Sequence, residues 1–142
     1  MRKCRIGIVG FGTVGTGIYK ILKSGDESHP ILKEIEIVKI AVKDIKKKRE
    51  ITLDSNLLVN DPNELIDDQS IDLIVEVMGG IDMAKEIILK SLRSGKSVVT
   101  ANKAVIARYG SEIYATASKE GVYILSEAAV CGGIPIIEPL KR

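Results

Sequence analysis

The feature that most constrains the fold is a glycine-rich turn between an apolar run and a helical pattern. The run is Ile6–Val9, the turn is Gly10-Phe11-Gly12-Thr13-Val14-Gly15, and the helical pattern covers residues 13–24. A G-x-G-x-x-G sequence between a strand and a helix is typical of dinucleotide-binding folds. The alternative is a glycine-rich turn without a ligand, and the two flanking elements argue against it.

Each glycine of this turn has a separate physical role in that interpretation. We expect Gly10 to allow the tight turn, Gly12 to let a pyrophosphate approach the backbone, and Gly15 to let the helix pack against the strand. The N–H groups at the start of the helix, with its positive dipole end, would then face the phosphates. The predicted inward face of this helix comprises Val14, Ile18, Ile21 and Leu22.

The rest of the chain alternates short apolar runs with helical segments. We predict strands at 4–9, 34–42, 57–59, 71–77, 97–100 and 122–126. We predict helices at 13–24, from 61, at 82–94, in a broken form over 103–120, and from 134 or 135. Asp61 and Asp82 are the expected N-caps of two of them. This alternation predicts a single α/β domain over residues 1–142 with a doubly wound, Rossmann-like parallel sheet. Ligands of such sheets bind at the carboxyl ends of the strands.

Charge and composition exclude several classes of function. The 142 residues include 21 basic and 19 acidic side chains, a net charge of +2, and only 4% are aromatic. With no basic stripe, nucleic-acid binding is not supported. No apolar run is long enough for a membrane span, and the N-terminus has no room for the apolar region of a signal peptide. We therefore expect a soluble, cytoplasmic protein.

The choice between NAD and NADP depends on the end of the second predicted strand. A carboxylate at this position binds the ribose 2′-hydroxyl of NAD, whereas a basic residue accommodates the 2′-phosphate of NADP. Here Lys43 comes first, Asp44 follows, and a basic run continues to Arg49. This placement of charge favours NADP and leaves NAD open, because Asp44 would repel a phosphate if it faced the same way. Any single lysine in the run is otherwise explained as part of a solvated turn.

Four stretches along the chain carry a resemblance to a known family. They are residues 10–15, 75–80, 94–103 and 126–135. Together they resemble the N-terminal nucleotide-binding domain of homoserine dehydrogenase, over almost the whole chain. The most specific parts are Thr100-Ala101-Asn102-Lys103 and the Glu-Ala-x-Val-x-Gly-Gly-Ile-Pro pattern from Glu127. The resemblance implies an oxidoreductase that reduces aspartate 4-semialdehyde to homoserine with a nicotinamide cofactor, on the route to threonine and methionine.

The resemblance also implies roles for individual residues. The turn residues Phe11, Gly12, Thr13 and Val14 would contact the dinucleotide phosphates, mostly through the backbone. Lys43 would bind the 2′-phosphate. Met78 and Gly79 would lie beside the adenosine side or the nicotinamide ribose. Lys103 would reach the nicotinamide and the substrate, and its position after a strand agrees with this role.

A monovalent-cation site is implied in the loop after the last predicted strand. The backbone carbonyls of Glu127, Val130, Gly132 and Ile134 would bind sodium, and carbonyl oxygens suit a hard cation. The residues alone do not reveal such a site, and a turn that leaves the sheet is the simpler explanation. Glu76, at the end of a buried strand, is expected either to be held by backbone donors or to help order the pocket.

The family places its catalytic lysine and substrate-binding acids in a later domain, which has no counterpart in these residues. We therefore expect this chain to bind the nucleotide and to turn over its small-molecule substrate poorly or not at all. The resemblance is compatible with a homodimer, whose contacts in the family mostly lie beyond Arg142. The alternative function is a stand-alone dinucleotide-sensing regulatory module. Such a module would need neither Thr100–Lys103 nor Glu127–Pro135.

Overall fold

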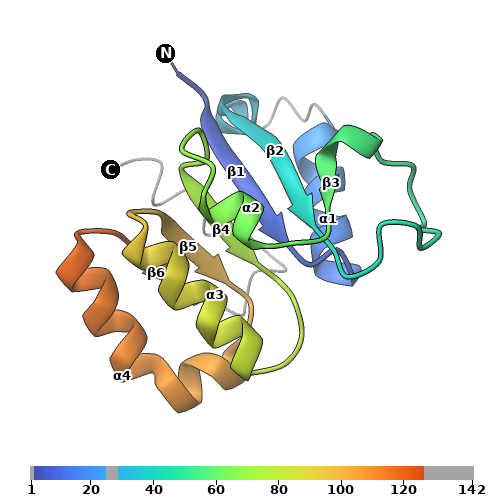
Figure 1. The fold of residues 1–142 in the computed structure, drawn as a ribbon. Coiled ribbons are helices and arrows are strands. Elements are labelled where there is room, and N and C mark those ends of the chain that lie inside the picture. The colour runs from blue at the N-terminus through green and yellow to red at the C-terminus, as the bar shows by residue number, and fades with distance from the viewer. Residues whose placement is uncertain (1, 25–28, 127–142) are drawn as a thin grey trace.

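The computed structural model describes residues 2–24 and 29–126. Its centre is a six-stranded sheet in the order β3-β2-β1-β4-β5-β6, with every adjacent pair parallel (Figure 1). The order reverses between β1 and β4, which is the switch point of a doubly wound fold. The predicted fold class is therefore confirmed. The strands are β1 (Cys4–Val9), β2 (Ile35–Ala41), β3 (Leu58–Val59), β4 (Leu73–Glu76), β5 (Ser97–Thr100) and β6 (Ile124–Leu125).

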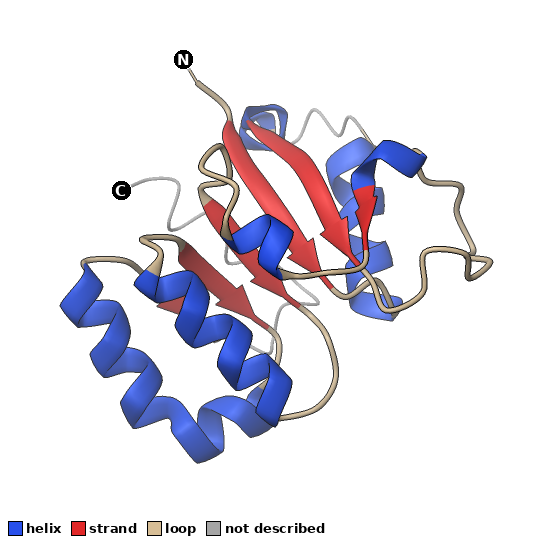
Figure 2. Ribbon diagram, viewed as in Figure 1, coloured by secondary structure: helices blue, strands red, loops and turns tan. Residues whose placement is uncertain are grey.

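Helices cover both faces of the sheet (Figure 2). One face packs against α2, α3 and α4, and the other packs against α1 and a short 3₁₀ helix. The α-helices are α1 (Thr13–Lys23), α2 (Asn63–Ile66), α3 (Asp82–Arg93) and α4 (Lys103–Glu120), and the 3₁₀ helices are η1 (Pro30–Glu34) and η2 (Ser55–Leu57).

Two hydrophobic cores follow from the alternation of side chains along the central strands. In β1, Ile6 and Ile8 face the α1 side, and Val9 faces the side of α3 and α4. In β4, Val75 and Ile74 divide in the same way. Successive side chains of a strand point to opposite faces, so a strand covered on both sides is apolar at nearly every position. This explains the continuous apolar runs in the sequence.

The inward face of α1 differs from the prediction. Ile18 is buried, but the side chains of Val14 and Ile21 are 42% and 44% exposed. The buried stripe is centred on Gly15, Ile18 and Leu22, since Gly15 is the residue that packs against the preceding turn. At 100° per residue, Val14 and Ile21 lie at the edge of that stripe.

The starts of α2 and α3 also differ from the prediction. Helix α3 begins at Asp82 itself, so this acid lies in the first turn and not at the N-cap, and Ile81 precedes the helix. A carboxylate still suits the positive end of the helix there. Helix α2 begins at Asn63, and the Asp61 carboxylate accepts a hydrogen bond from the Asn63 backbone N–H at 2.9 Å.

The predicted break in the helix over residues 103–120 is wrong, because α4 is continuous. It starts after Asn102, whose side chain accepts a hydrogen bond from the Val105 N–H, and it ends at Gly121 with a φ of +68°. Val105, Ile113 and Ala117 are buried along one side. Tertiary packing of this side holds the helix through Gly110, which by itself is a poor helix former.

Candidate functional site

Three loops meet at the carboxyl edge of the sheet. They follow β1 and β4, the strands that flank the switch point, and β5, which pairs with β4 on its other side. Backbone hydrogen bonds extend the strand ladders into these loops. Gly10 N–H donates to the Ala41 carbonyl and Val77 N–H to the Val9 carbonyl, both at 2.9 Å, and Ala101 N–H donates to the Glu76 carbonyl at 3.1 Å. The loops therefore start from fixed positions beside one another.

Two glycines of the first loop are required by their surroundings. Gly10 has a φ of +100°, and a Cβ atom there would lie 2.9 Å from the Met78 Cα and N atoms. A Cβ atom on Gly15 would lie 2.8 Å from the Gly10 carbonyl oxygen. The geometry of both positions matches the prediction: Gly10 makes a tight turn, and Gly15 lets the helix approach it closely.

Gly12 differs from these two glycines because its open side faces empty space. Apart from Gly12 itself and its two neighbours in the chain, no described heavy atom lies within 4 Å of the position that its Cβ would occupy. Gly12 is also the N-cap of α1, no side chain in the described chain caps this helix, and its first turn holds no acid. A helix start with these properties suits an anionic group. The residues present therefore fit the pyrophosphate of a dinucleotide.

The other residues predicted for the first loop lie around this helix start. Thr13 and Val14 are exposed, and Phe11 is half-buried. The Phe11 ring packs edge-to-face against the Tyr19 ring, with 5.9 Å between the ring centroids. The aromatic contact anchors the turn to α1 and leaves its backbone free to face a ligand.

The loop after β2 presents an exposed lysine and a carboxylate that is engaged with its own loop. Lys43 is exposed at the start of the loop. Asp44 is also exposed, but its Oδ1 atom accepts a hydrogen bond from the Lys46 N–H at 2.9 Å. The Arg49 guanidinium donates to the carbonyls of Asp44 and Lys47 at 2.6 and 2.9 Å. Lys43 and Asp44 were the residues that favoured NADP and NAD, respectively. Of their side chains, that of Asp44 is bonded within its own loop.

Glu76 is fully buried at the end of β4, and both of its carboxylate oxygens accept hydrogen bonds. One bond comes from the Met78 N–H at 2.9 Å, and the other comes from the Thr100 hydroxyl at 2.7 Å. Burial raises the pKa of Glu76, and these two hydrogen bonds lower it by less. The expectation that backbone donors hold this acid is therefore confirmed for Met78, with a side-chain donor in addition.

Lys103, Met78 and Gly79 all lie at this edge of the sheet. Met78 is half-buried and Gly79 is exposed, just after β4. Lys103 is exposed at the first position of α4, directly after the cap residue Asn102. Thr100 and Asn102 were noted in the sequence only as part of a family motif, and no role was predicted for either. An asparagine before a helical pattern is a recognisable cap signal, but the contact of Thr100 with Glu76 joins two strands and leaves no local signal.

The predicted sodium ligands Glu127, Val130, Gly132 and Ile134 lie outside the described residues. Within residues 2–24 and 29–126 there is no group of three or more His, Cys, Asp or Glu side chains that could hold a metal ion. None of the helices in the same ranges is both long and apolar enough to cross a membrane. The sodium site, the homodimer and the cytoplasmic location stay predictions.

The parallel sheet with a switch point, and a glycine turn that is open at Gly12, define a dinucleotide-binding domain of the Rossmann class. A family model described as "Homoserine dehydrogenase, NAD binding domain" matches residues 10–127. The chain belongs to the homoserine dehydrogenase family and carries its NAD-binding domain. A nicotinamide dinucleotide is therefore its cofactor.

Individual relatives agree with this assignment. Homoserine dehydrogenase from Synechocystis sp. is 47% identical over 138 residues, which cover 97% of this chain and 32% of that protein. The Bacillus subtilis enzyme is 42% identical over 144 residues, covering 100% of this chain and 33% of the relative. The crystal structure of a homoserine dehydrogenase from Thiobacillus denitrificans superposes with a TM-score of 0.81 at 39% identity, over 100% of this chain and 33% of that one. The chain thus spans about a third of the length of these relatives.

Proposed function

We propose that these residues are the nucleotide-binding part of an enzyme that reduces L-aspartate 4-semialdehyde to L-homoserine with NADPH. The observation that carries the proposal is the family match over a glycine turn whose geometry fits a pyrophosphate. The named relatives are homoserine dehydrogenases, and this chain spans a third of their length. We therefore propose that the substrate-binding acids and the catalytic lysine belong to the part of the enzyme that is not spanned.

The roles of the described residues follow from their positions. Gly12, with Thr13 and Val14 in the first turn of α1, would bind the pyrophosphate through backbone N–H groups. Met78 and Gly79 would contact the dinucleotide where it crosses the switch point. The bound cofactor supplies the hydride, and the share of the protein is to hold and orient the nicotinamide and to exclude water.

Lys103 is the residue that we place nearest to the substrate. It is exposed, and it occupies the N-terminal turn of α4, where the helix dipole disfavours a cation. A lysine that contacts an anionic group at the nicotinamide end would offset this unfavourable position. We propose that it binds at that end and does not replace the catalytic lysine.

We infer a preference for NADP from the loop after β2. Lys43 is exposed at the position where Rossmann domains select the nucleotide, and the Asp44 carboxylate is engaged with the Lys46 N–H. A cation in that position attracts a 2′-phosphate, and a carboxylate turned into its own loop repels it less.

The Lys43→Ala variant tests this preference. We expect its affinity for NADPH to fall about ten- to a hundredfold, because a charge-assisted hydrogen bond contributes roughly 1.5–3 kcal/mol. NADH affinity should change little. Calorimetric titration of both nucleotides measures the effect. Lys48→Ala, which removes the same charge from the same exposed loop, is the matched control. Equal losses for NADPH and NADH in Lys43→Ala would contradict the 2′-phosphate assignment.

Titration of the unmodified chain with NADPH and NADH, followed by an assay with aspartate semialdehyde, tests the function itself. Binding without turnover is the expected result, because these residues span only the nucleotide-binding third of the relatives' length. Turnover would show that the chemistry lies within these residues and would make Lys103 the first candidate. Failure to bind either nucleotide would reject the proposal, including the role of the Gly10–Gly15 turn.

A further inference from the structure

A chain of hydrogen bonds joins the loop after β4 to the loop after β5. Its centre is the buried pair formed by the Glu76 carboxylate and the Thr100 hydroxyl, both with no exposed surface. The second Glu76 oxygen holds the Met78 N–H in the first loop. The Thr100 hydroxyl oxygen in turn accepts from the Asn102 N–H in the second loop at 3.0 Å. One buried acid therefore fixes the backbone of both loops.

The Asn102 side chain adds a second connection between the two loops, on their exposed side. Its Nδ2 atom donates to the Gly80 carbonyl at 2.6 Å, across 22 residues of sequence. Its Oδ1 atom accepts from the Val105 N–H at 3.1 Å and so caps α4. The two loops are thus bonded at their base through Glu76 and Thr100 and at their tips through Asn102.

Stability alone is a weak explanation for this arrangement. The neighbouring positions of β4, Leu73, Ile74 and Val75, are buried and apolar, and an apolar residue at position 76 would avoid the cost of burying a carboxylate. Buried charged groups are often no better for stability than well-packed apolar ones. Burial does raise the pKa of Glu76, which shows that the site disfavours the charged form. An apolar residue, however, could accept neither the Met78 N–H nor the Thr100 hydroxyl, whose oxygen holds the Asn102 N–H.

We propose that Glu76, Thr100 and Asn102 are positioning residues that hold the loops after β4 and β5 in place against the nicotinamide half of the bound cofactor. The inference rests on the proposed function. In a doubly wound sheet each half takes one mononucleotide unit. The half with β1, β2 and β3 carries the glycine turn and Lys43, so the half with β4, β5 and β6 takes the nicotinamide unit. None of the three side chains needs to contact the reacting atoms.

The test compares two ligands and two substitutions at Thr100. The ligands are NADPH and 2′-phospho-ADP-ribose, which lacks only the nicotinamide. Thr100→Val keeps the shape of the side chain but removes the hydroxyl that links Glu76 to the Asn102 N–H. We expect its Kd for NADPH to rise about tenfold, while its Kd for 2′-phospho-ADP-ribose stays within about twofold. Thr100→Ser keeps the hydroxyl and should restore NADPH binding.

A second variant covers the case in which Thr100→Val does not fold. Asn102→Ser keeps a good helix cap but is too short to reach the Gly80 carbonyl, so it removes only the bridge between the loop tips. It should weaken NADPH binding about three- to tenfold and leave 2′-phospho-ADP-ribose unchanged.

The possible outcomes separate this inference from the proposed function. If the unmodified chain binds both ligands but the variants lose affinity for both equally, or for neither, the positioning role is wrong and the proposed function stands. If Thr100→Ser behaves like Thr100→Val, the hydroxyl is not the link and the inference is wrong. If the unmodified chain binds neither ligand, both fail together.

Discussion

The two edges of the sheet use carboxylates in opposite ways. At the carboxyl edge, Glu76 is fully buried, and burial raises its pKa. At the amino edge, Asp68 and Asp72 are partly exposed, and hydrogen bonds from Ser70, with Lys39 nearby, lower the pKa of Asp68 to about 2. The surroundings of Glu76 therefore disfavour its charged form, whereas the surroundings of Asp68 favour its charged form.

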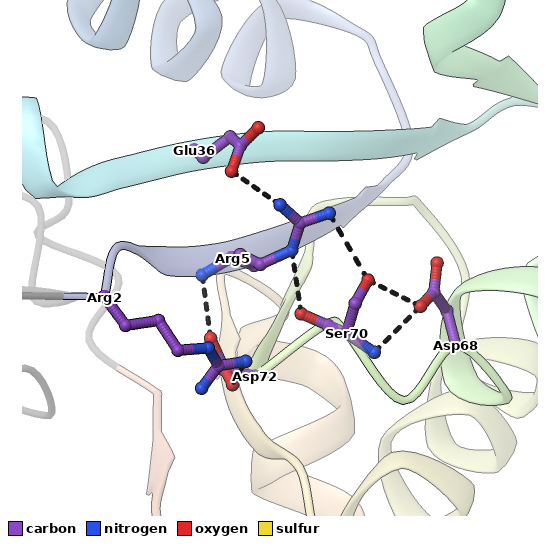
Figure 3. Close-up of polar contacts among 6 residues, drawn as sticks. All are labelled: Arg2, Arg5, Glu36, Asp68, Ser70 and Asp72. Carbon is purple, nitrogen blue, oxygen red and sulfur yellow. Dashed lines mark hydrogen bonds and ion pairs between the residues drawn. The ribbon is translucent and has the colours of Figure 1, made fainter.

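The amino-edge network joins β1, β2 and the segment before β4 (Figure 3). The Arg5 guanidinium donates to the Glu36 carboxylate at 2.7 Å and to the Ser70 carbonyl at 3.1 Å. The Arg5 backbone N–H donates to Asp72 at 2.9 Å, and Asp72 also pairs with Arg2. Partly exposed pairs of this kind contribute modestly to stability. They lie at the amino ends of the strands, away from the loops that would bind the ligand.

The comparison separates a stabilising edge from a binding edge. Variants at the amino edge should change the free energy of unfolding and leave nucleotide affinity unchanged. Variants at the carboxyl edge should change affinity. They should change stability where the backbone is crowded, as at Gly10, or where they alter the buried Glu76 and Thr100 pair.

The largest effect is expected at Gly10, where the backbone is crowded. Gly10→Ala combines a positive φ with a Cβ atom 2.9 Å from the Met78 backbone, and it should lower the free energy of unfolding by about 2–4 kcal/mol. Urea denaturation measures this loss. Gly12→Ala is the control, because its Cβ meets no described atom within 4 Å. It should cost less, about 1 kcal/mol, while still weakening NADPH binding. Equal destabilisation by the two variants would contradict the distinction between these glycines.

The next effect tests the amino edge. Arg5→Ala removes hydrogen bonds from a partly buried guanidinium to Ser70 and Glu36, and it should lower the free energy of unfolding by about 1–2 kcal/mol. The Kd for NADPH should stay within about twofold. Arg2→Ala is the matched control, since the Arg2 side chain is 66% exposed and should contribute less than about 0.5 kcal/mol. A large loss of NADPH affinity in Arg5→Ala would show that the two edges are not independent.

How much of this could be predicted from the sequence depended on whether the signal was local. The glycine turn and the alternation of strands and helices are encoded within a few residues, and the structure confirms them. The predicted N-cap of α3 and the predicted break in α4 were wrong. Tertiary packing decides where a helix begins and whether it continues past a glycine.

The features of the candidate site also divide into those with a local signal in the sequence and those without one. The open side of Gly12 could be expected from its place in the turn, as could the positions of Lys43 and Lys103 at strand ends. The link from Glu76 through Thr100 to Asn102 could not, because it spans 24 residues between Glu76 and Thr100 and appears only when β4 and β5 pair. The amino-edge network is also non-local, since Arg5 and Asp72 are 67 residues apart.

A pH series tests the sign of the Glu76 effect. Because its pKa in the folded protein lies above the usual 4.5, the folded state holds this proton more tightly than the unfolded state does. Its contribution to stability is therefore fully present below about pH 4.5 and is lost as the pH rises through the raised pKa. Glu76→Gln cannot titrate, so the unmodified protein should lose stability relative to this variant as the pH rises from 4.5. A relative gain would contradict the assignment.

Asp68 should show the opposite sign and the smallest effect. Its pKa is about 2 in the folded protein, against an ordinary value of 3.8, so the unfolded state binds the proton more tightly. Its stabilising contribution is present above about pH 4 and is lost as the pH falls toward 2. Because the side chain is partly solvated, we expect this contribution to be about 0.5–1 kcal/mol.

Thermal unfolding of the unmodified protein and of Asp68→Asn between pH 2.5 and 6 measures this difference, which should shrink as the pH falls. Lys39→Gln makes the test sharper. It removes the ion pair at 3.0 Å but keeps both hydrogen bonds from Ser70. Since the Ser70 side-chain hydrogen bond is the largest cause of the lowered pKa, Lys39→Gln should retain most of the pH dependence. If Lys39→Gln abolished the pH dependence, charge pairing and not hydrogen bonding would be the main interaction of Asp68. The comparison with the hydrogen-bonded Glu76 would then be wrong.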